Sequence, residues 1–180
     1  MAVYNVVTGQ GITVKNLGAN MLITGIGDGA DAVQSCSVVM FFNTKSCAAG
    51  LFHFPAGNVK KELGSKAALT AMSKAVSPND CYIAYGVTNL VSVFAGPGAT
   101  FSTTGVPTDP NHSDLREFVL GILPDGGRLR RMPAESRRAS IRQEGNSAII
   151  GSDLPTGAVT NLGKFAAGPQ AGYTIYWKGK

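Results

Sequence analysis

Short apolar runs separated by glycine and polar breaks dominate the first half of the chain, a pattern typical of short β-strands. The first three predicted strands cover residues 3–8, 12–17 and 21–26, with breaks at Gly9, Gly11, Gly18 and Gly25. A turn-rich stretch follows at residues 27–31. The nearly continuous apolar run at 35–42 is then typical of a buried strand.

The polar tetrapeptide at residues 43–46 predicts a hairpin loop, with residues 47–54 as the return strand. This loop sets the register of the two strands. It predicts that Phe42 faces Cys47, Met40 faces Ala49, Val38 faces Leu51 and Cys36 faces His53. Directly opposed residues have Cβ atoms about 4.5–5.5 Å apart, so a thiol and an imidazole could meet. A slip of one residue would move His53 to the other face.

Apolar spacing predicts two helices. Residues 66–76 place Leu69, Met72 and Val76 on one face, with Ser65 as a possible N-cap. A second helix runs from Ser113 to about Leu123, with its apolar face at Leu115, Phe118, Val119 and Ile122. Further strands are predicted at 81–87, 90–95, 147–150 and 173–177, with a loop at 96–111.

These elements predict a single α+β domain over residues 1–180, with a largely antiparallel, β-sandwich-like core flanked by helices. The length suits one domain, and no apolar stretch approaches the 18 residues of a membrane span. The first residues do not resemble a Sec-type signal peptide. We therefore expect either the bacterial cytoplasm or export into a host cell by a dedicated secretion machine, and no membrane partner.

The net charge of +5 is local. Residues 128–142, called here the Arg-rich segment, hold six arginines (128, 130, 131, 137, 138 and 142) and one acid, Glu135. A solvated or mobile face is the simplest interpretation, and docking of an acidic partner is an alternative. Nucleic acid is disfavoured because no aromatic residue is interleaved there.

The chain has three cysteines, Cys36, Cys47 and Cys81, without a CxxC pair, and two histidines. This number and spacing of cysteines and histidines does not favour a disulfide framework or a structural zinc site, and no metal or organic cofactor is expected. Cys47 and Cys81 are interpreted as small buried residues, and His112 as a solvated residue. A glycine pattern at 25–30 resembles a dinucleotide motif but is followed by a β-run rather than the required helix.

Cys36 and His53 are the candidate chemical pair. A thiolate is the nucleophilic form of cysteine, and an imidazole can take its proton and later protonate a leaving group. Ser35 and Cys36 directly follow the turn-rich stretch, where backbone N–H groups could face an oxyanion. A buried structural pair is the alternative interpretation.

The residues around this pair resemble a known family. Gln34-Ser35-Cys36-Ser37-Val38-Val39, followed by Ala49-Gly50-Leu51-Phe52-His53-Phe54-Pro55, is similar to the bacterial chemoreceptor glutamine deamidases of chemotaxis. That family reads Gly-Ser-Cys, an apolar strand, a short loop and Gly-Gly-Met-x-His, with the same spacing of cysteine and histidine. The cytotoxic necrotizing factor and Burkholderia lethal factor toxins share its fold, so the resemblance implies a deamidase-toxin-like fold.

Two positions depart from the family. Gln34 stands where the family has glycine, and Ala30 stands where its chemotaxis members and the lethal factor toxin carry a threonine that orients the histidine. Asp31, Thr24 or a backbone carbonyl could take over that role. The resemblance covers residues 34–55 and extends to 88. Its weakness in the second half favours a delivered effector over a chemotaxis protein.

The resemblance implies hydrolysis of a glutamine side-chain amide on a protein substrate with an exposed glutamine. Cys36 would attack the amide carbon, His53 would protonate the departing ammonia and then activate water, and Ser35 would support the oxyanion. Two alternatives stay open. The same pair could serve a cysteine protease or transglutaminase, or the domain could be a non-catalytic binding module that uses the Arg-rich segment.

Overall fold

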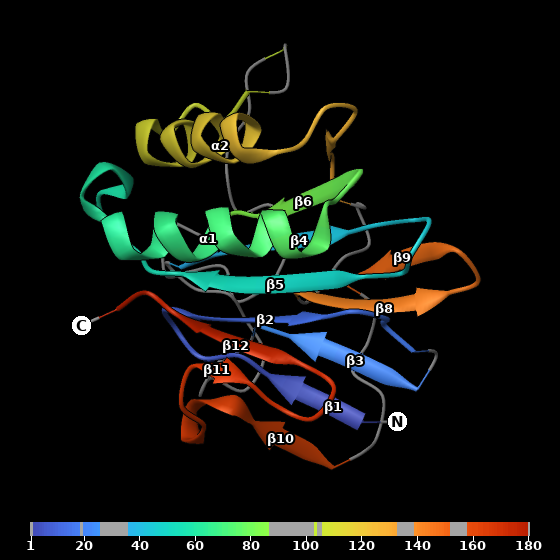
Figure 1. Cartoon of the computed structure of the whole chain (residues 1–180). Helices are drawn as coiled ribbons and strands as arrows, with labels where there is room; N and C mark the ends of the chain where they lie inside the picture. Colours follow the sequence, from blue (N-terminus) through green and yellow to red (C-terminus); the bar gives the residue numbers. More distant parts are fainter. Residues whose placement is uncertain are drawn as a thin grey trace.

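The structure, a computed structural model, describes residues 2–18, 20–25, 36–86, 103, 106–132, 139–151 and 158–179. Its strands form two sheets (Figure 1). The five-stranded sheet has the order β10 (Val159–Asn161), β1 (Ala2–Asn5), β3 (Met21–Thr24), β8 (Ser140–Glu144) and β9 (Ser147–Ile150). The seven-stranded sheet has the order β11 (Gly168–Pro169), β12 (Thr174–Trp177), β2 (Gln10–Val14), β5 (Ala49–Phe54), β4 (Ser37–Phe42), β6 (Asp80–Ala84) and β7 (Arg128–Arg130).

Most strand pairs are antiparallel, as predicted. The parallel pairs are β1 with β10, β1 with β3, and β6 with β7. The helices are α1 (Leu63–Val76) and α2 (Pro110–Ile122), and single 3-10 turns occur at η1 (Val59–Lys61) and η2 (Leu162–Lys164). The prediction of mixed α and β structure with mostly antiparallel strands is therefore confirmed.

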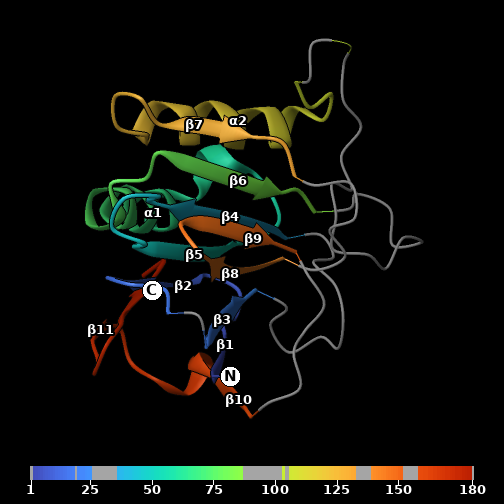
Figure 2. The same cartoon turned by 90° about the vertical axis from the view of Figure 1, so that its right-hand side faces the viewer.

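Strand β4 separates two apolar cores because its side chains alternate between the faces of the sheet. Val38, Met40 and Phe42 belong to the core shared with the five-stranded sheet, which contributes Ile23 and Ile141. The intervening Val39 and Phe41 belong to the core under the helices. Figure 2 shows the helices above one face of the seven-stranded sheet and strands β8 and β9 against the other. A strand buried on both faces explains the continuous apolar run predicted at 35–42.

Helix α1 packs Leu69, Met72 and Val76 against the seven-stranded sheet, which confirms the predicted face. It begins at Leu63, earlier than predicted, and Ser65 lies inside it with its hydroxyl donating to Glu62 Oε2 at 2.8 Å. Helix α2 begins at Pro110 rather than Ser113. The Asp109 carboxylate caps it by accepting from the N–H groups of Asn111 and His112, so the chain enters the helix three residues sooner.

The predicted hairpin register is wrong by two residues. Phe42 pairs with Ala49 and Val38 pairs with His53, so Cys36 does not directly oppose His53. The loop is longer because Asn43 Oδ1 accepts from the N–H groups of Lys45 and Ser46, and Cys47 adopts a left-handed φ of 58°. A shift of two preserves the alternation, so His53 still faces the side expected for Cys36.

Both ends of the Arg-rich segment lie in strands. Arg128, Leu129 and Arg130 form β7, which pairs with β6, and Arg142 lies in β8. Arg130 donates from Nε to Asp80 at 2.6 Å, and both Arg128 and Arg130 are exposed, as expected of a solvated face. Residues 133–138, with Arg137 and Arg138, and the strand predicted at 90–95 lie outside the described residues.

Candidate functional site

The candidate pair lies where β4 begins and β5 ends, beneath the chain that connects β1 to β2. Strand β5 holds His53 beside β2, and the N–H of Gly9 donates to the His53 carbonyl at 2.8 Å. The N–H of Val6 donates to the Thr24 carbonyl at 2.9 Å, which ties the same connection to β3. Residues 6–9, called here the β1–β2 connection, are therefore fixed to both sheets at this rim.

The register of β4 and β5 predicts that Cys36 and His53 are neighbours, although Cys36 itself comes just before the first paired residue, Ser37. Val38 directly opposes His53, and Cys36 precedes Val38 by two residues. If the β4 direction is continued to Cys36, the thiol and the ring stand diagonally across the pair on one face. Such diagonal positions are about 7–8 Å apart, with side chains somewhat closer. A flexible thiol and an imidazole can bridge that separation directly or through one water molecule.

The β1–β2 connection contacts both members of the pair. His53 Nδ1 lies 3.3 Å from the Val6 carbonyl oxygen, and Cys36 Sγ lies 3.9 Å from Thr8 Oγ1. No hydrogen bond joins the thiol to the ring in the part of the chain that the structure describes. One backbone connection thus positions both groups.

The Val6 carbonyl defines the protonation of His53. A carbonyl can only accept, so Nδ1 carries a proton, and in the neutral ring Nε2 keeps its lone pair. Burial lowers the pKa of His53, and the hydrogen bond to Val6 partly offsets that effect. The side chain is 6% exposed. A neutral imidazole with a free Nε2 is the form that a general base requires.

The three cysteines differ in their exposure to solvent, with Cys47 and Cys81 buried as predicted. Cys36 is partly exposed, whereas Cys47 and Cys81 are buried at 8% and 0% exposure in the two cores. Burial raises the pKa of the Cys81 thiol. Cys47 Sγ accepts from Gln143 Nε2 at 3.1 Å. Cys36 is therefore the cysteine that a reagent or substrate can reach.

Of the predicted supporting residues Thr24, Asp31 and Ser35, the structure describes Thr24. The Thr24 hydroxyl is buried and donates to the Ala139 carbonyl at 3.5 Å. Asp31 and Ser35 lie outside the described residues. Among the described residues, the group found on the ring is a backbone carbonyl, that of Val6.

Sequence reasoning missed Val6 and Thr8, because a backbone carbonyl leaves no residue-type signal and Thr8 has no distinctive spacing. It also misplaced His112. This side chain is 5% exposed and its ring lies 5.2 Å from that of Tyr85. Burial lowers the pKa of His112, and the Asp109 carboxylate partly offsets this. Because α2 begins at Pro110, His112 sits in its first turn and packs inward instead of lying in a polar loop.

The described residues contain no cluster of three or more histidine, cysteine or acidic side chains suited to a metal ion. None of the described helices combines the length and apolarity needed to cross a membrane. In comparisons with known proteins, no family model, no curated protein and no solved structure matches the chain.

Proposed function

We propose that the chain is a cysteine-dependent amidohydrolase that deamidates a glutamine side chain on a protein, with Cys36 as nucleophile and His53 as base. One observation carries the proposal. The Val6 carbonyl fixes a neutral His53 with its Nε2 free, on the strand beside a partly exposed Cys36. The resemblance around residues 34–55 supplies the reaction class.

The proposed reaction begins when His53 Nε2 takes the thiol proton and Cys36 Sγ attacks the amide carbon. The tetrahedral intermediate collapses as the imidazolium protonates the leaving nitrogen, which releases ammonia and forms a thioester. Nε2 then takes a proton from water, and the hydroxide attacks the thioester carbon. The glutamate product leaves, and the proton returns to Cys36 Sγ.

The surroundings favour this cycle. The desolvated ring stays neutral near pH 7, so each proton that it accepts is readily returned. The hydrogen bond to Val6 holds the ring as charge develops on it, a role that other dyads assign to a side-chain carboxylate or threonine. The Thr8 hydroxyl beside the sulfur can stabilise the thiolate by donating to it.

The same dyad could instead serve a protease or a transglutaminase, which differ in the leaving group or in the nucleophile that resolves the thioester. An acidic partner at the Arg-rich segment belongs to the non-catalytic alternative. In that segment Arg128 is exposed at the edge strand β7, whereas Arg130 is already paired with Asp80. We place the enzyme in bacteria, acting there or as a delivered effector.

The test uses intact mass and released ammonia, measured on candidate target proteins and on a synthetic glutamine peptide. Deamidation adds about one mass unit and leaves the chain length unchanged, because an acid replaces an amide. Cys36→Ser and His53→Ala should each abolish ammonia release, while Cys47→Ala, a cysteine at the opposite end of the hairpin, should retain it. Thermal melts check folding. Peptide fragments or cross-linked products would reject the deamidase in favour of the alternatives.

A further inference from the structure

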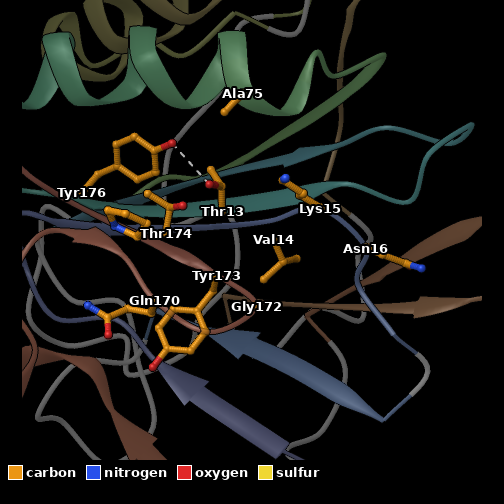
Figure 3. Close-up of a pocket in the computed structure, with 11 residues that line it drawn as sticks. Thr13, Val14, Lys15, Asn16, Ala75, Gln170, Gly172, Tyr173, Thr174 and Tyr176 are labelled. Carbon is orange, nitrogen blue, oxygen red and sulfur yellow. Dashed lines mark hydrogen bonds between the residues drawn. The ribbon is translucent and has the colours of Figure 1, made fainter.

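A cavity lies at the end of β2 that is opposite to the candidate dyad. It has a volume of about 530 Å³ and is formed by the end of β2, the turn between β11 and β12, and the last turn of α1 (Figure 3). Thr13 pairs with Gly50, near the start of β5, whereas His53 lies near the end of that strand. The cavity is within the range of small-molecule sites, and the proposed thiol chemistry does not use it.

Four polar side chains line one side of this cavity. Thr13 and Thr174 are directly paired across β2 and β12. Tyr176 follows Thr174 by two residues, so alternation directs Thr13, Thr174 and Tyr176 to the same face, and Lys15 comes directly after the last residue of β2. Figure 3 shows the Lys15 amine and the hydroxyls of Thr13, Thr174 and Tyr176 on the side of the cavity nearest to α1. These four residues are called here the donor cluster.

The donor cluster carries a positive charge and offers hydroxyl protons to a ligand. Thr13 donates to Tyr176 Oη at 3.3 Å, which leaves the Tyr176 proton free for another acceptor. Lys15 is the one charged residue among those lining the cavity, and it has no ion pair within the described ranges. None of the described residues that line the cavity is acidic. A ligand that accepts hydrogen bonds and carries negative charge satisfies this set.

The end of α1 does not oppose such a ligand strongly. A helix C-terminus carries partial negative charge on its last carbonyls. Here the Asn43 side chain donates to the carbonyls of Val76 and Ser77 at 3.3 and 2.7 Å. Ala75 presents a methyl group to the cavity, so the helix contributes an apolar wall.

The volume exceeds what a lone inorganic ion fills. On the side away from the donor cluster the cavity is bounded by Gln170, Gly172 and Tyr173. The Tyr173 ring is braced against Tyr4, with centroids 5.1 Å apart. A rigid ring and an amide suit the hydroxyl-bearing body of a small organic molecule.

We propose that this cavity binds a small, hydroxylated organic anion, with its carboxylate or phosphate group on the donor cluster and its body over Tyr173 and Gln170. Lys15 supplies the charge, and the hydroxyls of Thr174 and Tyr176 supply directional hydrogen bonds. The site acts independently of the dyad.

Calorimetric titration of the full chain with four probes tests this proposal: ribose 5-phosphate, gluconate, inorganic phosphate and neutral ribose. Ribose 5-phosphate or gluconate should bind more tightly than inorganic phosphate, and ribose should bind at least about tenfold more weakly, since a charge-assisted hydrogen bond is lost. Preference for the sugar phosphate identifies a phosphate site, and preference for gluconate a carboxylate site.

Variants locate the site. Lys15→Gln should weaken binding about tenfold or more and Tyr176→Phe several-fold. The matched control Lys61→Gln removes an exposed lysine from η1 outside the cavity and should leave affinity unchanged, as should Cys36→Ser. The proposal is overturned if neither organic anion binds at about 10 mM, which also implies no thermal stabilisation. Equal binding of ribose, or affinity unaltered by Lys15→Gln, would overturn it as well.

Discussion

Two helix glycines should respond in opposite ways to the same substitution. Gly64 lies in the first turn of α1 and Gly121 near the end of α2. A Cβ built on Gly64 would lie 1.5 Å from the Lys178 carbonyl oxygen and 2.6 Å from its carbon, whereas nothing lies within 4 Å of a Cβ on Gly121. Gly64 therefore allows the chain after β12 to pass against α1.

Opposing effects decide the sign of the change in the free energy of unfolding. Replacing glycine by alanine in a helix stabilises it by up to about 1 kcal/mol. At Gly64 the clash is with backbone, so the segment at Lys178 must move, at a cost typical of overpacking of about 1–3 kcal/mol. That movement also strains the bond from the Lys178 N–H to the Gly9 carbonyl, 2.8 Å long. Gly64→Ala should thus destabilise the protein by up to about 2 kcal/mol net.

Thermal unfolding of the two variants measures the difference. A domain of this size changes Tm by about 2–4 °C per kcal/mol. Gly64→Ala should lower Tm by up to about 8 °C, and Gly121→Ala should leave it unchanged or raise it by up to about 4 °C. If Gly64→Ala raises Tm as much as Gly121→Ala does, the close passage of the C-terminal chain over α1 is wrong.

Three further outcomes follow from the packing. Burial holds the pKa values of His53 and His112 below the ordinary 6.5, so the unfolded chain binds more protons below that pH. Stability should be full above about pH 6.5 and fall as the pH decreases toward the folded values. Urea unfolding at pH 7.5 and 5.5 checks this, and equal midpoints after correction for other groups would contradict it. Asn43→Ala removes the acceptor of two loop N–H groups and the donor to the end of α1. It should lower the free energy of unfolding by about 1–3 kcal/mol. A loss below about 0.5 kcal/mol would contradict the stabilising role of these Asn43 hydrogen bonds. Cys81→Asp places a charge in the core under the helices and should prevent stable folding at pH 7, so a native circular dichroism spectrum with a cooperative melt would show that Cys81 is not buried.

Patterns of apolar residues predicted much of the fold, because a strand buried on both faces leaves a continuous apolar run and a helix with one apolar face leaves a periodic one. Strand β4 and the face of α1 that carries Leu69, Met72 and Val76 follow from such local patterns. The hairpin register did not follow. The register depends on the Asn43 side chain and on the left-handed backbone of Cys47. The polar residues at 43–46 are compatible with a loop of either four or six residues.

The candidate site was predicted in part. Cys36 and His53 are residue types with chemistry, and the register shift of two leaves His53 on the face expected for Cys36 because strand alternation has period two. The groups that hold them were not predictable. The Val6 carbonyl reaches a ring 47 residues away, and Thr8 contacts a thiol 28 residues away. His112 likewise packs its ring beside that of Tyr85, a residue that directly follows β6 and is distant in the sequence.

The most direct test of the Cys36–His53 dyad is the rate of Cys36 alkylation by iodoacetamide from pH 5 to 9, followed by peptide mapping in the wild type and in His53→Gln. The dyad predicts that Cys36 reacts faster than Cys47 and Cys81, and that His53→Gln slows Cys36 and alters its pH profile, because the base that takes the thiol proton is gone. Superimposable profiles for the two proteins, with melting curves unchanged, would contradict it.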